Sequence, residues 1–208
     1  MTKVCNREAL NDRHFDMLRE IGSIGSGNAA TAISQLLGRP VNMSVPHVSV
    51  LDVKRFVNIL GGPENQAVGV LFTLDEDFQG MVMFVTEREF AHLSLNALLG
   101  MDFRSFDELR EMELSALKEV ANIMVGSYLN AISDLTGMRI GLSAPAIAID
   151  MAGAVLSVPA LELERPGERA LFIQDGFTGG KEQAAGHIIL LAEQGYLEKM
   201  LRILGMEI

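Results

Sequence analysis

The sequence predicts an α+β fold made of two copies of one helix–strands–helix unit. Three observations lead to this prediction. Residues 16–46 align without gaps on residues 115–145, each aligned segment opens with a long helical pattern, and each half closes with two strand-like runs and a helix-like run. Helices and strands segregated along the chain in this way are typical of α+β proteins rather than of doubly wound sheets.

Identical residues recur in register throughout the aligned segments. Glu20 aligns with Glu119, and the run at residues 32–34 is repeated at residues 131–133. Ungapped identity of this density does not arise by chance. We therefore expect both halves of the chain to share one architecture.

The closing elements occur in the same order in both halves. We expect two strands and a helix at 67–74, 80–86 and 88–99 in the first half, and at 170–175, 187–192 and 193–204 in the second. Both helix-like runs stop at a Leu-Gly pair, which is the C-cap signature of glycine at Gly100 and Gly205. One domain, 1–208, is therefore expected to contain repeats at about 12–100 and 111–205, joined by a charged linker at 101–113.

Composition and charge argue against two classes of partner, nucleic acids and membranes. The 208 residues carry 17 Lys and Arg against 27 Asp and Glu, a formal net charge of −10, which repels phosphate backbones and anionic lipid headgroups. We therefore expect no nucleic-acid and no membrane partner. The most apolar long stretch, 144–163, is interrupted by Asp150 and Pro159 and is rich in β-formers, so it predicts buried strands rather than a membrane span.

The few histidines and the single cysteine bear on whether the chain binds a metal and in which compartment it works. The four histidines are far apart and show no ligand spacing, so no structural metal is expected. The single cysteine cannot form an internal disulfide, and the first twenty residues contain no apolar stretch of signal-peptide length. A cytoplasmic location is the expectation.

Two neighbouring stripes of residues run along the second predicted long helix. The apolar stripe, which should face the core, consists of Leu117, Ala121, Met124 and Tyr128. The polar stripe beside it consists of Ser115, Glu119, Asn122 and Gly126, and the first helix carries its counterpart in Asp16, Glu20, Ser23 and Gly27. A solvated helix face is the simplest explanation of such a stripe, but the recurrence of glutamate and glycine in register favours a surface that meets a partner closely.

The segment 25–30 has the form G-x-G-x-x-A, which invites comparison with a dinucleotide-binding turn. No strand precedes it, because 11–22 is charged and helical in period, and the aligned segment keeps only one of the two glycines. We interpret these small residues as sites where the two long helices approach each other, and a nucleotide-binding enzyme as the most remote alternative.

The spacing Ser115-x3-Glu119-x2-Asn122-x22-Pro145 resembles the signature of the CheC/CheX/FliY family of bacterial chemotaxis phosphatases, and most closely that of its CheC-type members. Asp16-x3-Glu20-x2-Ser23-x22-Pro46 matches the same signature except at Ser23. The resemblance covers nearly the whole chain. It implies a pseudo-two-fold α+β domain with the two long helices side by side on the surface.

The resemblance also implies an activity and two partners. It implies hydrolysis of the aspartyl phosphate of the response regulator CheY, and binding of the deamidase CheD. No cofactor of the chain's own is expected, since the regulator supplies its Mg²⁺. The same resemblance assigns Glu119 to an ion pair with a lysine of the regulator and places Asp150 near the region that contacts CheD.

The side chains suit this chemistry. An acyl phosphate is already activated, so the phosphatase chiefly positions a water in line with the leaving oxygen. The amide of Asn122 can accept from that water and donate to a phosphoryl oxygen, whereas it cannot act as a general base. The hydroxyl of Ser23 is too short to contact the water and the phosphoryl oxygen together, so we expect the Glu20/Ser23 site to be impaired.

Supporting roles are expected for the remaining motif residues. Ser115 and Asp16 are interpreted as helix-start or supporting residues, and Pro145 and Pro46 as residues that shape the start of a strand beside each site. The main alternative function is a non-catalytic or weakly catalytic binding module that regulates CheD or the flagellar switch. The intact Glu119/Asn122 pair favours catalysis, whereas the altered first motif favours the alternative.

Overall fold

A computed structural model describes residues 10–44, 46–50, 53–162, 169–179, 182–193 and 195–206 of the chain. The first nine residues, on which part of the export-signal expectation rests, lie outside the described residues. Leu163, the end of the apolar stretch, lies outside them too. Within the part of the chain that is described, no helix is both long enough and apolar enough to cross a membrane.

In both halves the predicted long helix, strands and closing helix occur in the predicted order, with short helices between them that were not predicted. The first half contains α1 (Asp12–Leu37), β1 (Asn42–Met43), β2 (His47–Val50), α2 (Val53–Ile59), β3 (Gln66–Glu76), β4 (Gly80–Thr86) and α3 (Arg88–Leu99). After the short 3-10 helix η2 (Phe106–Glu108), the second half contains α4 (Glu111–Thr136), β5 (Ile140–Leu142), β6 (Ala146–Met151), α5 (Ala152–Val155), α6 (Ser157–Glu162), β7 (Arg169–Gly179), β8 (Glu182–Ala192) and α7 (Tyr196–Ile203). The α+β class and the internal duplication are confirmed.

Glycines end the helices where the sequence predicts it. Gly100 has a φ of 65° and Gly205 a φ of 78°, both in the left-handed region that a side chain disfavours. Gly38 and Gly137 end the two long helices in the same conformation, with φ values of 61° and 70°. The two long helices thus end alike, whereas Gly100 caps α3 directly and Gly205 comes one residue after Leu204, the C-cap of α7.

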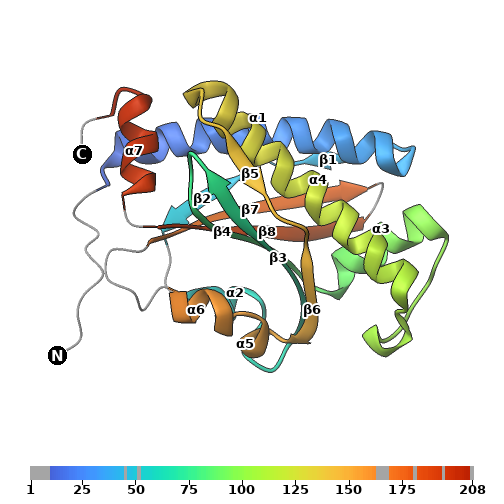
Figure 1. Cartoon of the computed structure of the whole chain (residues 1–208). Helices are drawn as coiled ribbons and strands as arrows, with labels where there is room; N and C mark the ends of the chain where they lie inside the picture. The colour runs from blue at the N-terminus through green and yellow to red at the C-terminus, as the bar shows by residue number, and fades with distance from the viewer. Residues whose placement is uncertain are drawn as a thin grey trace.

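The described strands form one eight-stranded antiparallel sheet in the order β1-β7-β8-β4-β3-β5, with β2 also paired to β7 and β6 to β3 (Figure 1). The central contact joins β4 to β8, one strand from each half. At the margins the halves exchange strands, because β1 and β2 pair with the hairpin of the second half while β5 and β6 pair with that of the first. Each half thus completes the sheet of the other.

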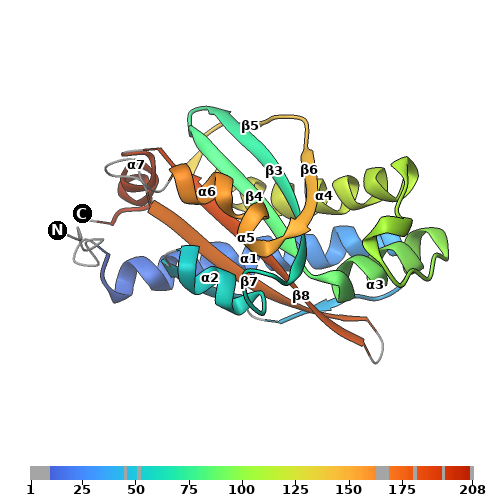
Figure 2. The same cartoon turned by 90° about the horizontal axis from the view of Figure 1, so that it is seen from below.

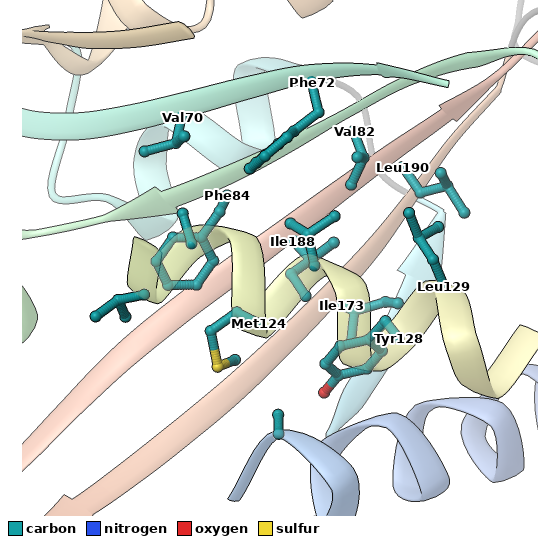
Figure 3. Close-up of a cluster of buried hydrophobic side chains, with 14 of the residues drawn as sticks. Val70, Phe72, Val82, Phe84, Met124, Tyr128, Leu129, Ile173, Ile188 and Leu190 are labelled. Atoms are coloured by element: carbon teal, nitrogen blue, oxygen red, sulfur yellow. The ribbon is translucent and has the colours of Figure 1, made fainter. Parts of the chain in front are cut away.

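One face of the sheet is covered by α1 and α4, and the alternation of side chains along the strands builds the core there (Figure 3). Val82 and Phe84 of β4 point toward this face. The apolar stripe predicted for the second long helix is buried on this face, because Leu117, Ala121, Met124 and Tyr128 are at most 3% exposed. Burial of this stripe fixes which face of α4 remains outside.

The opposite face of the sheet is covered by α2, α5 and α6 (Figure 2). The prediction of strands throughout 144–163 is wrong beyond Met151, because the chain leaves the sheet there and forms α5 and α6. The N–H of Ala152 donates to the carbonyl of Asn65 (2.7 Å) and that of Gly153 to the carbonyl of Pro63 (3.0 Å), which turns the chain onto this face. The apolar side chains of this segment therefore pack on the face of the sheet, and its backbone adds no further strand.

Candidate functional site on the two long helices

The helices α1 and α4 lie side by side on one face of the sheet and run in opposite directions (Figures 1 and 2). Their separation is set at Gly25, where an added Cβ would lie 2.6 Å from Cδ1 and 3.0 Å from Cα of Tyr128. A glycine is therefore required at this position for the two backbones to approach. The segment 25–30 lies in the middle of α1, which agrees with helix packing and not with a phosphate-binding turn at a helix start.

The second pair of motif residues lies on the outer face of α4. Glu119 and Asn122 are three residues apart, about one helical turn, and both are exposed. Between them, Val120 and Ala121 are buried. Neither motif side chain forms a hydrogen bond or ion pair with another described residue, so both are available to a molecule that approaches from outside.

The first pair occupies the equivalent place on α1. Glu20 and Ser23 are exposed, and within the described residues neither has an intramolecular hydrogen-bond or ion-pair partner. One turn earlier, Asp16 accepts a hydrogen bond from Arg19 Nη1 at 2.6 Å, an exposed ion pair. The two halves thus present the same carboxylate, followed by an amide in one and a hydroxyl in the other.

The interpretation of Ser115 and Asp16 as helix-start residues is wrong. The helix α4 begins at Glu111, where the backbone N–H of Arg110 donates to Glu113 Oε2 at 2.8 Å, and α1 begins at Asp12 after Asn11. Both motif residues therefore lie one turn inside their helices. They extend the exposed stripes toward the helix N-termini, where a supporting role remains a prediction.

The two motif prolines precede the strands β2 and β6. Pro46 is buried against α1, since a Cβ placed on Gly22 would lie 3.1 Å from Pro46 Cγ. This contact holds the start of β2 against the helix one residue before Ser23. Pro145 is half-buried immediately before β6. A proline is tolerated at these positions because the first residue of a strand need not donate to the sheet.

Gly27, one of the small residues at 25–30 that were expected to let the two long helices approach, does not make this contact, and neither does its counterpart Gly126. Apart from neighbouring residues of the same helix, no atom lies within 4 Å of a Cβ placed on either. The close approach occurs instead at Gly25, whose importance the sequence alone did not distinguish.

Asp150 lies on another part of the molecule, in the outer strand β6. Its side chain is exposed, Oδ1 accepts from the N–H of Met151 at 2.7 Å, and its backbone pairs with Ala67 of β3. The carboxylate is therefore not buried inside the protein, although Asp150 interrupts an apolar stretch of the sequence. Asp150 faces outward at a margin of the sheet.

The electrostatic character of both motif pairs is simple. Each offers one carboxylate on a helix face that is open to solvent, suited to a cation on a partner. Across the described residues, no group of three or more His, Cys, Asp or Glu side chains is arranged to hold a metal ion. An exposed carboxylate and amide one turn apart can bind a cation, position a water and donate a hydrogen bond to an anion.

Comparison with known proteins agrees with these features. Residues 14–50 and 112–149 match the model of the CheC-like family, so each match covers one long helix and the strands after it. The chain is 32% identical over 200 residues to the CheY-P phosphatase CheC of Bacillus subtilis, which covers 94% of this chain and 96% of that protein. It is 31% identical over 141 residues to the flagellar motor switch phosphatase FliY of the same organism, covering 67% of this chain and 36% of FliY.

Among solved structures, FliY of Thermotoga maritima superposes with a TM-score of 0.77 at 24% identity, covering 95% of this chain and 98% of that chain. At this identity the likeness shows the fold. The identity to the Bacillus relative over almost the full length of both proteins, together with the two family matches in register with the repeat, shows that the chain belongs to the CheC-like family.

Proposed function

We propose that this chain hydrolyses the aspartyl phosphate of a CheY-type response regulator, with Glu119 and Asn122 as its principal site. The observation that carries the proposal is this exposed pair on α4, one turn apart and without a partner among the described residues. The relative that is 32% identical over nearly the full length of both proteins is named a CheY-P phosphatase, which supports the same activity. Release of inorganic phosphate from phosphorylated CheY, measured with and without the chain, tests it.

The proposed reaction needs little covalent chemistry from the phosphatase. A water attacks phosphorus, the bond to the aspartyl oxygen breaks, and the products are the free aspartate and inorganic phosphate, with the proton of the water passing to phosphate or solvent. Asn122 accepts a hydrogen bond from the water and donates one to a phosphoryl oxygen, which aligns the attack. Its exposed position on a helix allows it to enter a site on the regulator.

Glu119 has a positioning role in this proposal. Its carboxylate forms an ion pair with a lysine of the regulator and holds α4 in register over the phosphate. Closing the interface removes water from the pair, and truncating one partner of such a pair costs on the order of 2–5 kcal/mol, much of it from leaving the other charge unpaired. At the first site, Glu20 can form the same ion pair, whereas Ser23 lacks the reach to align the water.

We expect Glu119→Lys to weaken binding of activated CheY and to lower phosphate release at least about tenfold, because it places like charge against the partner lysine. A binding titration with regulator carrying a phosphoryl mimic, paired with the release assay, measures both effects. Glu64→Lys, the same charge change in the loop before β3, serves as the matched control and should alter neither. Unchanged affinity in Glu119→Lys would remove this residue from the interface.

A second, binding function is supported by Asp150. We propose that β6 contacts CheD, because Asp150 presents an exposed carboxylate at a margin of the sheet, away from the stripes of α1 and α4. Asp150→Lys is expected to weaken CheD binding at least about tenfold. Phosphate release from CheY should stay normal, because the substitution is outside the two stripes.

A pull-down or titration with CheD, beside the release assay, checks this expectation. Asp134→Lys, an equal charge change on an exposed residue of α4, is the control for non-specific repulsion. Joint loss of CheD binding and of phosphate release would instead indicate that Asp150 stabilises the fold through its hydrogen bond to Met151. Retention of CheD binding without any phosphate release in the wild-type chain would favour the non-catalytic binding module.

A further inference from the structure

The relative position of the two motif pairs follows from how the helices cross. The helices are antiparallel, and Gly25 of α1 lies against Tyr128 of α4. By the repeat, Tyr128 corresponds to Ala29 and Gly25 to Met124, and both counterparts are fully buried. The centre of the crossing is therefore midway between these positions along each helix axis, level with Gly27 and Gly126, which themselves face away from the helix contact.

This crossing places the two motif pairs on opposite sides of one centre. Ser23 and Asn122 each lie four residues before the stripe glycine of their own helix, which is about 6 Å along each axis. Packed helix axes are about 8–10 Å apart. The two side chains are thus attached to backbone positions about 15 Å from each other, on the same outer surface.

A folded partner is much wider than this distance. A globular domain of about 100 residues has a radius of gyration of about 13 Å, which corresponds to a sphere about 34 Å across. Suppose that one such sphere rests on each motif pair. If the outer face were flat, the centres of the two spheres would be only about 15 Å apart, less than one diameter. If the face curved like a sphere of this chain's own size, with a radius of about 22 Å, the centres would be about 26 Å apart, and the spheres would still overlap.

We propose that the Glu20/Ser23 and Glu119/Asn122 positions cannot be occupied at the same time, so that one chain binds one response regulator in either of two alternative positions. This inference rests on the proposed function and adds a mode of regulation to it. A regulator bound at Glu20/Ser23 is held by the same carboxylate contact but meets a hydroxyl instead of the amide. It therefore blocks the productive position while it stays bound.

Exclusive binding has a kinetic signature that independent sites lack. When a substrate binds in a productive and a non-productive position, kcat and KM fall by the same factor and kcat/KM is unchanged. The factor is one plus the ratio of the two association constants, about two for equal affinities. Two independent sites would leave the kcat of the Glu119/Asn122 site untouched by events at Glu20.

The binding test uses the full chain and CheY activated with beryllofluoride. Calorimetric titration gives the affinity and the stoichiometry, and analytical ultracentrifugation gives the mass of the complex. We expect one regulator per wild-type chain, one per Glu20→Lys chain, one per Glu119→Lys chain and none per double variant. The Kd values of the two single variants give the association constants of the two positions. Two regulators per wild-type chain, or no binding to Glu119→Lys, would overturn the inference while leaving the proposed phosphatase activity intact.

The kinetic test is phosphate release by Glu20→Lys at varied concentrations of phosphorylated CheY. We expect kcat and KM to rise together by the factor that the two Kd values give, with kcat/KM unchanged. Glu64→Lys, the same substitution outside the helix face, should leave both constants at the wild-type values. An unchanged kcat in Glu20→Lys would contradict exclusion. If the wild-type chain binds one regulator per chain but releases no phosphate, the proposed function is contradicted instead.

Discussion

Replacing Asn122 with alanine is expected to remove most of the phosphate release, with a loss at least about tenfold greater than that of Ser23→Ala, or roughly 1.4 kcal/mol in barrier height. The amide is the group that aligns water and phosphoryl oxygen in the proposed reaction, and no other described residue of the α4 stripe carries an amide beside Glu119. The side chain is exposed, so the fold should be unaffected. Alanine also has the higher helix propensity, and Tm should not fall.

The measurement is single-turnover phosphate release with the phosphatase in saturating excess over phosphorylated CheY. Under this condition the rate reports the chemical step and not binding. Ser23→Ala is the matched control, because it truncates the equivalent position on α1. Thermal unfolding of each variant verifies the fold. Equal losses at the two positions would mean that the two sites contribute equally and that the amide has no special role.

Ser23→Asn in an Asn122→Ala background is expected to restore turnover, at least about tenfold above Asn122→Ala alone. The structure preserves the surroundings that the asparagine would need. Glu20 is exposed one turn earlier, and Pro46 packs on Gly22 immediately before Ser23. Because the position is on an exposed helix face, the cost in stability should be within about 0.5 kcal/mol.

The same release assay measures the restoration, with Ser23→Gln as a control that has the amide at the wrong length. A double variant that folds normally and stays as inactive as Asn122→Ala would show that the first site has lost more than its amide. The exposed Asp16–Arg19 ion pair would then be the first local difference to remove.

The elements that the sequence predicted best are those fixed by local chemistry. The strand β4 and the helix α3 begin and end as expected, because strand alternation, a left-handed glycine at 100 and the helical period are all visible over a few residues. The outward direction of Glu119 and Asn122 follows from the same period, since the buried stripe beside them fixes the rotation of α4.

The features that the sequence did not predict depend on distant partners or on ambiguous composition. The run after Met151 is apolar and rich in Ala and Val, which suits a buried strand and a short helix equally. The backbone bonds to Asn65 and Pro63 decide between them. Likewise, α4 begins at Glu111 because Glu113 accepts from the N–H of Arg110, and arginine is not a residue whose side chain marks a helix start.

The exchange of outer strands between the halves has a consequence for synthesis on the ribosome. β2 pairs with β7 through partners such as Val48 and Ile173, about 125 residues apart in the chain. At about 5–20 residues per second, roughly 6–25 s pass between translation of the two strands. During that interval the nascent first half has no partner for β2, so hydrophobic residues such as Val48, buried in the finished protein, need another temporary neighbour. Folding therefore becomes cooperative only late in translation, and truncation anywhere before β7 should yield an aggregation-prone fragment rather than a folded half.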